Sequence, residues 1–183
     1  MNSLAISEKG ALDSAKSEAP SSGQYLTFLV SGDALGVDIG DVKEIIEITN
    51  ITRVPMTPDY IRGVINLRGN VVPVVDLSAR LGHGLNEISK RSCIILIEVS
   101  CGDEKQSLGM LVDQVQEIIN IPIENRQPAP TFGTDVRVEF IQAMGRIEDK
   151  FVILLDITRV LSVEELAELS ESARSSESLL LAE

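Results

Sequence analysis

The sequence predicts an all-β protein built from two small five-stranded barrels that share one hydrophobic core, followed by a C-terminal helix. Short runs alternate apolar and polar residues, as at Leu35, Val37 and Ile39, and a period of two is typical of half-buried strands. Gly- and Pro-containing turns separate these runs. The same order of runs occurs twice, which indicates a duplicated fold, because a solenoid needs about three or more repeats.

Composition narrows the class of protein. Hydrophobic residues make up 44% and aromatic residues 3%, so the core should be aliphatic. The net charge of −12 lacks the basic footprint of a nucleic-acid-binding protein. One His and two Cys are too few for a zinc site, and no cofactor is expected. No apolar stretch is long enough for a signal peptide or a membrane span, so we expect a cytoplasmic protein that does not insert into the membrane.

The chain begins with residues 1–23, which are rich in Ser, Ala, Gly and charge and predict a disordered leader. The first lobe is expected over about 24–82. Within it, residues 61–68 and 71–77 form strand-like runs around Gly69-Asn70. A pair that begins with Gly suits a two-residue turn of type II′, so an antiparallel hairpin is predicted.

The second lobe is expected over about 91–161, and it repeats the first. Residues 35–48 match 108–121 at a constant spacing of 73, and 60–81 match 140–161 at a spacing of 80. A unit of this size closes best as a barrel, because closure removes exposed strand edges. One such barrel alone would be marginally stable, so two are expected to pack together.

The C-terminal part has a helix signal. Ser162 and Glu165 form a capping box, which predicts a helix over about 162–173. Residues 174–183 are expected to be a loose acidic tail. Residues 162–183 hold six Glu against one Arg, a net charge of −5.

Three carboxylates are the best candidates for acid–base chemistry: Asp38, Asp76 and Asp156. Asp76 and Asp156 occupy equivalent repeat positions at strand ends, where a carboxylate ordinarily caps the following turn. No constellation of nucleophile, base and orienting group is visible, so we do not expect an enzyme. A small acidic hydrolase using these residues stays as a remote alternative.

One strand carries a polar face. Arg62, Val64, Asn66 and Arg68 share the solvent-side register of the run that precedes the predicted turn. From the pattern alone this is an ordinary polar surface, whose ion pairs would contribute little to stability.

The same strand also carries a family resemblance. Residues 60–77, YIRGVINLRGNVVPVVDL, resemble the signature of the CheW family of chemotaxis coupling proteins. Further family-like motifs follow in order and with compatible spacing at 35–39, 42–46, 108–115, 127–130 and 154–156. The resemblance therefore covers a CheW-like domain of about 24–170.

This resemblance implies two SH3-like barrels and a non-enzymatic adaptor. Such adaptors join the cytoplasmic tip of methyl-accepting chemoreceptors to the regulatory domain of the CheA histidine kinase. They lie in the cytoplasm and are recruited to membrane-attached receptor arrays. A paralogous adaptor for surface motility or second-messenger control is an alternative that the sequence leaves open.

The resemblance also implies a binding surface on the first lobe. Glu44 and Arg68 match family positions implicated in receptor and kinase coupling. Arg68 is expected to pair with a receptor carboxylate in a bidentate geometry that Lys would not reproduce. The complete set of expected receptor- or kinase-binding residues is Val42, Glu44, Arg62, Gly63, Asn66, Leu67 and Arg68.

Overall fold

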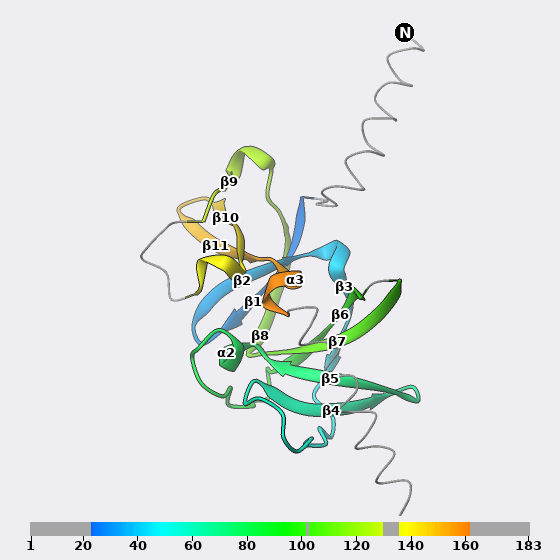
Figure 1. Ribbon diagram of the computed structural model, residues 1–183. Helices are drawn as coiled ribbons and strands as arrows, with labels where there is room; N and C mark the ends of the chain where they lie inside the picture. Colours follow the sequence, from blue (N-terminus) through cyan, green and yellow to red (C-terminus); the bar gives the residue numbers. More distant parts are fainter. Residues whose placement is uncertain (1–22, 102, 130–135, 162–183) are drawn as a thin grey trace, which may run out of the picture.

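The computed structural model describes residues 23–101, 103–129 and 136–161. These residues are mostly strand, arranged in two sheets, with only two short α-helices (Figure 1), which confirms the all-β class. The predicted C-terminal helix at 162–173, the tail at 174–183 and all but the last residue of the 1–23 leader lie outside the described residues.

One sheet is made from the middle of the chain, and we call it the central barrel. Its strand order is β3-β6-β7-β5-β4. The strands are β3 (Val42–Glu47), β4 (Ile61–Leu67), β5 (Asn70–Asp76), β6 (Cys93–Cys101) and β7 (Glu104–Val112). The short helix α2 (Leu77–Arg80) follows β5 directly.

The other sheet combines both ends of the described chain, and we call it the terminal barrel. Its strand order is β8-β1-β2-β11-β10-β9. The strands are β1 (Gln24–Val30), β2 (Asp33–Asp38), β8 (Gln114–Asn120), β9 (Arg126–Gln127), β10 (Ile141–Ile147) and β11 (Lys150–Leu155). Helix α3 (Ile157–Val160) follows β11, and 3-10 turns lie at Ile39–Asp41 (η1), Ile123–Asn125 (η2) and Val138–Phe140 (η3).

Each sheet closes on itself in the same way. In the central barrel, Thr52 and Val64 exchange backbone hydrogen bonds of 2.8 Å, so the chain that continues from β3 pairs with β4. In the terminal barrel, β9 continues from β8, and its Gln127 pairs with Met144 of β10. Met144 is the repeat equivalent of Val64, 80 positions later. Both sheets therefore close as SH3-like barrels with five main strands each, and the two-residue β9 is a sixth strand in the terminal barrel.

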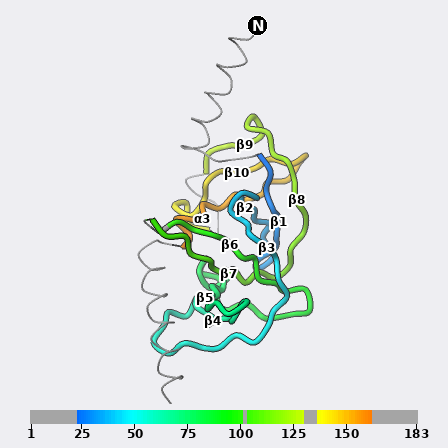
Figure 2. The backbone as a smooth tube through the Cα atoms, turned by 90° about the vertical axis from the view of Figure 1, so that its right-hand side faces the viewer, coloured from blue at the N-terminus to red at the C-terminus, as the bar shows by residue number. Residues whose placement is uncertain are grey.

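The two barrels do not follow the expected lobes of about 24–82 and 91–161, and this is a correction. Strands β1 and β2 lie between β8 and β11, so blue and orange segments adjoin in Figure 1 and in the side view of Figure 2. The parallel pair Leu154–Gly36 in one barrel corresponds to Val74–Gly109 in the other, at the repeat spacings of 80 and 73. The two repeats have therefore exchanged their first hairpins. Both copies carry the same alternating pattern, so the sequence does not show which copy a strand pairs with.

The exchange places the largest hydrophobic cluster between the barrels. Phe28 and Leu35 come from the terminal barrel, Ile97 and Met110 come from the central barrel, and all four side chains are fully buried. Each barrel also encloses a smaller cluster of its own, around Val74 in one and Leu154 in the other. Composition predicted a largely aliphatic core, and the small size of each barrel predicted that it is shared; both predictions are confirmed.

The hairpin between β4 and β5 is confirmed, but its predicted turn residues are wrong. Leu67 pairs with Asn70, so the turn is Arg68-Gly69 and not Gly69-Asn70. Both turn residues have positive φ, 53° at Arg68 and 86° at Gly69, as a turn of type I′ requires. The register is one residue earlier because Leu67 packs against the core of the central barrel. The turn holds Arg68 in a left-handed conformation at the tip of the hairpin.

Candidate functional site

Arg68 and Glu44 form a two-point ion pair at one end of the central barrel. Arg68 Nη1 donates to Glu44 Oε1 at 2.9 Å, and Nη2 donates to Oε2 at 3.1 Å. Glu44 lies on β3, the first strand in the sheet order, whereas Arg68 follows β4, the last. Barrel closure brings them together. The Arg68 side chain is 71% exposed and that of Glu44 29%, so the guanidinium remains accessible to a partner.

The terminal barrel shows that closure does not require this pair. By the repeat spacings, Arg68 corresponds to Glu148 and Glu44 corresponds to Glu117, two acids that cannot form an ion pair. Glu148 adopts the same left-handed conformation, with φ of 54°. The left-handed conformation of the first turn residue is thus shared by both barrels, and the Arg–Glu pair belongs to one of them. An exposed pair contributes about 0–1 kcal/mol to stability, so its removal should leave the fold intact.

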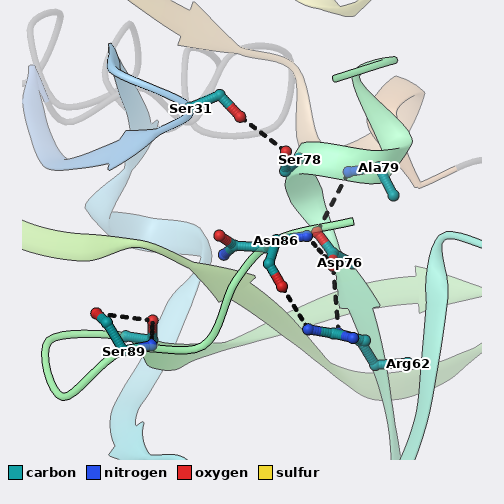
Figure 3. A network of polar contacts seen from close by, with 8 residues as sticks. Ser31, Arg62, Asp76, Ser78, Ala79, Asn86 and Ser89 are labelled. Atoms are coloured by element: carbon teal, nitrogen blue, oxygen red, sulfur yellow. Dashed lines mark hydrogen bonds and ion pairs between the residues drawn. The ribbon is translucent and has the colours of Figure 1, made fainter. Parts of the chain in front are cut away.

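Arg62 has a different environment from the one expected. Its Nε lies 3.3 Å from Oδ2 of Asp76, whose side chain is fully buried, and its Nη2 donates to the Asn86 carbonyl at 2.5 Å (Figure 3). The backbone N–H of Asn86 donates to Asp76 Oδ2 at 2.8 Å. Arg62 therefore holds the loop after α2 against β4. It does not project freely from the solvent-side register, and its side chain is 24% exposed.

The other predicted residues mostly support the shape of the surface. Gly63 has φ of 143°, and a Cβ there would collide with the Thr52 backbone. Asn66 is exposed, and its Oδ1 accepts the Gly69 N–H at 3.0 Å inside the turn. Leu67 is half-buried against the core of the central barrel, and Val42 packs against the shared core.

The expected residues consequently divide along β4. Arg68, Asn66 and Leu67 gather at the hairpin tip with Glu44, whereas Arg62 and Gly63 lie at the other end of the strand. Arg68 follows Arg62 by six positions, which is about 20 Å along an extended strand. We treat the tip, defined as Glu44, Asn66, Leu67 and Arg68, as the candidate site.

Sequence reasoning missed one exposed apolar residue beside this site. Ile45 lies on the outer face of β3 with 44% of its surface exposed, between the exposed Lys43 and Glu47. Its repeat equivalent on β8, Ile118, is also exposed, at 55%. The sequence of β3 could have revealed Ile45, because it alternates in step with Lys43 and Glu47 and therefore lies on the same outer face as these charged residues.

The three acids considered for hydrolysis all hold backbone N–H groups. Asp38 accepts from Gly40, Asp76 from Ala79 and Asp156 from Arg159. The capping roles predicted for Asp76 and Asp156 are confirmed. Within the described ranges, no group of three His, Cys, Asp or Glu residues is placed to hold a metal ion.

Comparison with known proteins decides the family. The family model for the CheW-like domain matches residues 24–165. The chain belongs to the CheW family. It is 31% identical over 152 residues to the chemotaxis protein CheW of Klebsiella aerogenes, covering 83% of this chain and 89% of that protein. It is 35% identical over 142 residues to CheW of Rhizobium meliloti, covering 78% and 89%.

A solved CheW structure also matches the described fold. The crystal structure of the scaffolding protein TtCheW from Thermoanaerobacter tengcongensis superposes with a TM-score of 0.70 at 34% identity. The match covers 78% of this chain and 90% of that chain. Fold and sequence thus lead to the same family.

Membership of the CheW family shows what kind of function the chain has. The chain is a non-enzymatic chemotaxis scaffold, as expected from the resemblance, and its partners are in general receptors and kinases. The remote hydrolase interpretation is abandoned on the same ground. In the part of the chain that the structure describes, no helix is long and apolar enough to cross a membrane.

Proposed function

We propose that this CheW-like chain joins the cytoplasmic tip of methyl-accepting chemoreceptors to the regulatory domain of the CheA histidine kinase. It does so in the cytoplasm, within arrays at the membrane. The observation that carries the proposal is the exposed Arg68–Glu44 pair at the hairpin tip, which has no counterpart in the terminal barrel.

The hairpin tip has the chemistry of a charged docking point. A guanidinium presents five donors in a fixed fork, and Glu44 occupies one edge of it. A partner carboxylate can bind the outward edge or displace Glu44. The two hydrogen bonds to Glu44 already orient the Arg68 side chain, so less side-chain ordering is needed on binding. A helical receptor tip that carries an acidic residue suits this arrangement.

The kinase contact is proposed on the ends of both barrels. The regulatory domain of the kinase is expected to have the same two-barrel fold, so one of its barrels can pack on a barrel of this chain in a pseudosymmetric way. The repeat-related registers of the two barrels support this proposal, because they give the chain two similar barrel ends. Val42, Arg62 and Gly63 then act indirectly by holding the shape of the central barrel.

Calorimetric titration tests the receptor contact. The wild-type chain and the variants Arg68→Ala and Glu44→Ala are titrated with a receptor-tip fragment and, separately, with the kinase regulatory domain. We expect Arg68→Ala to weaken receptor binding about 30-fold, the effect of a hot spot of about 2 kcal/mol. Glu148→Ala, the equivalent turn position of the terminal barrel, is the matched control and should change affinity by less than about threefold.

Two results of the same titrations would contradict the proposed function. Equal receptor affinities for wild type, Arg68→Ala and Glu148→Ala would remove the hairpin tip from the interface. No binding of either partner at tens of micromolar would favour an adaptor of another chemosensory pathway.

A further inference from the structure

A pocket lies in the central barrel at the end of β4 opposite the hairpin tip. It has a volume of about 310 Å³ and is formed by residues 53–59, the start of β4 and Leu85. The buried side chains of Val54 and Ile61 line it. Met56 is fully exposed at its edge, and Leu85 is 57% exposed. Met56 and Leu85 thus offer a partner exposed apolar surface at the edge of a mixed polar and apolar pocket.

Hydrogen bonds fix the conformation of the pocket wall. Thr57 Oγ1 donates to the Val54 carbonyl at 2.8 Å, and Ile61 N–H donates to the Pro58 carbonyl at 3.0 Å. These bonds hold Met56 at φ of 62°, a conformation that is unfavourable for a non-glycine residue. On the other side, Arg62 fixes the carbonyl of Asn86, the neighbour of Leu85. The apolar edge is therefore pre-organised for binding.

The pocket also carries an unpaired positive charge. Arg53 lines it, is exposed, and forms no ion pair or side-chain hydrogen bond with any described residue. Arg62 is committed to Asp76, and Asp59 is the acid of the lining. An occupant with apolar side chains beside a carboxylate would complement this surface.

The chain itself contains such a segment. Leu179, Leu180 and Leu181 stand together between Glu177 and Glu183, in the acidic stretch that follows the described residues. Leu180 follows Leu161 by nineteen positions, an extended reach of about 60 Å. A domain of this size has a radius of gyration of only about 14 Å, so the segment can reach the pocket.

We propose that residues 177–183 bind in this pocket, with the leucines against Met56 and Leu85 and a glutamate beside Arg53. The contact covers apolar surface within the same chain. Because the segment is tethered to the barrel, its effective concentration at the pocket is on the order of a millimolar. A weak intrinsic affinity is therefore enough to keep the pocket occupied. The proposal does not depend on the adaptor function.

Paramagnetic relaxation in the full-length chain tests this contact. Ser178→Cys carries a nitroxide label in a background with Cys93 and Cys101 replaced by Ser, and the methionine methyl groups carry ¹³C. We expect selective broadening of the Met56 methyl signal, assigned with Met56→Leu. The buried Met110 methyl should stay sharp, and a label at Ser3→Cys should not reproduce the effect.

Two sets of variants separate the apolar and charged contributions. Replacing Leu179, Leu180 and Leu181 by Ser should abolish the broadening, since each buried leucine contributes roughly tenfold or more to affinity. Arg53→Glu should reduce it severalfold, whereas Lys150→Glu on the terminal barrel is the matched charge control and should leave it unchanged.

Three outcomes would overturn the proposal. The Met56 signal could stay sharp, or it could broaden equally in the triple-serine variant. Alternatively, broadening could occur when the labelled chain is mixed with a separate ¹³C-labelled chain at the same concentration, which would assign the segment to a second copy.

Discussion

Gly63 shows how one residue allows two backbone segments of the central barrel to approach closely. Its φ of 143° lets the backbone of β4 approach Thr52 closely, so that Thr52 and Val64 can exchange backbone hydrogen bonds. Gly69 also has positive φ, but no atom lies within 4 Å of where its Cβ would stand. The two glycines therefore separate the effect of backbone conformation from that of collision.

Gly63→Ala should lower the free energy of unfolding by about 3 kcal/mol or more, because strain and collision with a backbone add together. Gly69→Ala is the control and should lower it by about 1–2 kcal/mol from strain alone. Chemical denaturation checks both values. Similar losses for the two variants would show that close approach to Thr52 is not what Gly63 provides.

Asp41 is the residue whose charge the fold disfavours. Burial raises the pKa of its carboxyl above the ordinary value of 3.8, and the nearby charges of Asp38 and Asp156 raise it further. The native state therefore binds more protons than the unfolded state between 3.8 and the raised pKa, so stability falls as the pH rises through that window.

Asp41→Asn should increase stability at pH 7 and flatten the pH dependence of unfolding above pH 3.8. Thermal denaturation across a pH series measures both effects. Asp59→Asn, an exposed position, is the control and should leave the curve nearly unchanged. A loss of stability at pH 7 in Asp41→Asn would contradict the assigned cause.

At the scale of elements, the two strand-to-helix junctions are equivalent in sequence and different in energetics. Asp76 caps α2 and Asp156 caps α3. Asp76 is fully buried, pairs with Arg62 and holds Asn86, whereas the Asp156 side chain is 33% exposed and lies 3.6 Å from Arg159 of its own helix.

Asp76→Ala should lower the free energy of unfolding by about 3–5 kcal/mol, because it removes a cap and leaves Arg62 without its buried partner. Asp156→Ala should lower it by about 1 kcal/mol, the usual effect of losing a cap. Equal losses, measured by urea denaturation, would mean that the Arg62 network adds nothing to stability.

Sequence patterns predicted the strands, the repeat, the shared core and the caps, because each depends on local periodicity or on single residues. They did not predict the exchanged hairpins, since the two copies are equivalent as patterns. The turn was predicted at Gly69-Asn70, one residue too late, because glycine suits either the first or the second position of a two-residue hairpin turn. The role of Arg62 was missed because its partners, the Asp76 carboxylate and the Asn86 carbonyl, lie 14 and 24 positions further along the chain, where no local pattern marks them.

At the scale of the whole molecule, Arg80 lies where the two repeats meet. Its guanidinium is 4.7 Å from the ring centroid of Tyr60 and 5.2 Å from that of Phe140, which are equivalent positions 80 residues apart. Its Nε donates to the Val160 carbonyl of α3 at 2.6 Å. Together with the core between the barrels, this contact couples the barrels into one unit.

The chain should therefore unfold in a single cooperative transition. Leu35→Ala, in the shared core, should lower the free energy of unfolding by about 2–5 kcal/mol and shift the whole transition. Calorimetry checks this result. Two resolved transitions in the wild-type chain would contradict the coupling.

We propose that this CheW-like scaffold bridges a receptor, bound at the hairpin tip, and a kinase, bound at the barrel ends. Sedimentation of kinase with receptor-containing membranes tests it directly. We predict that the kinase enters the pellet when the chain is added, that Arg68→Ala lowers this recruitment severalfold, and that Glu148→Ala does not. Kinase recruitment that is the same with wild type, with Arg68→Ala and without the chain would contradict the account.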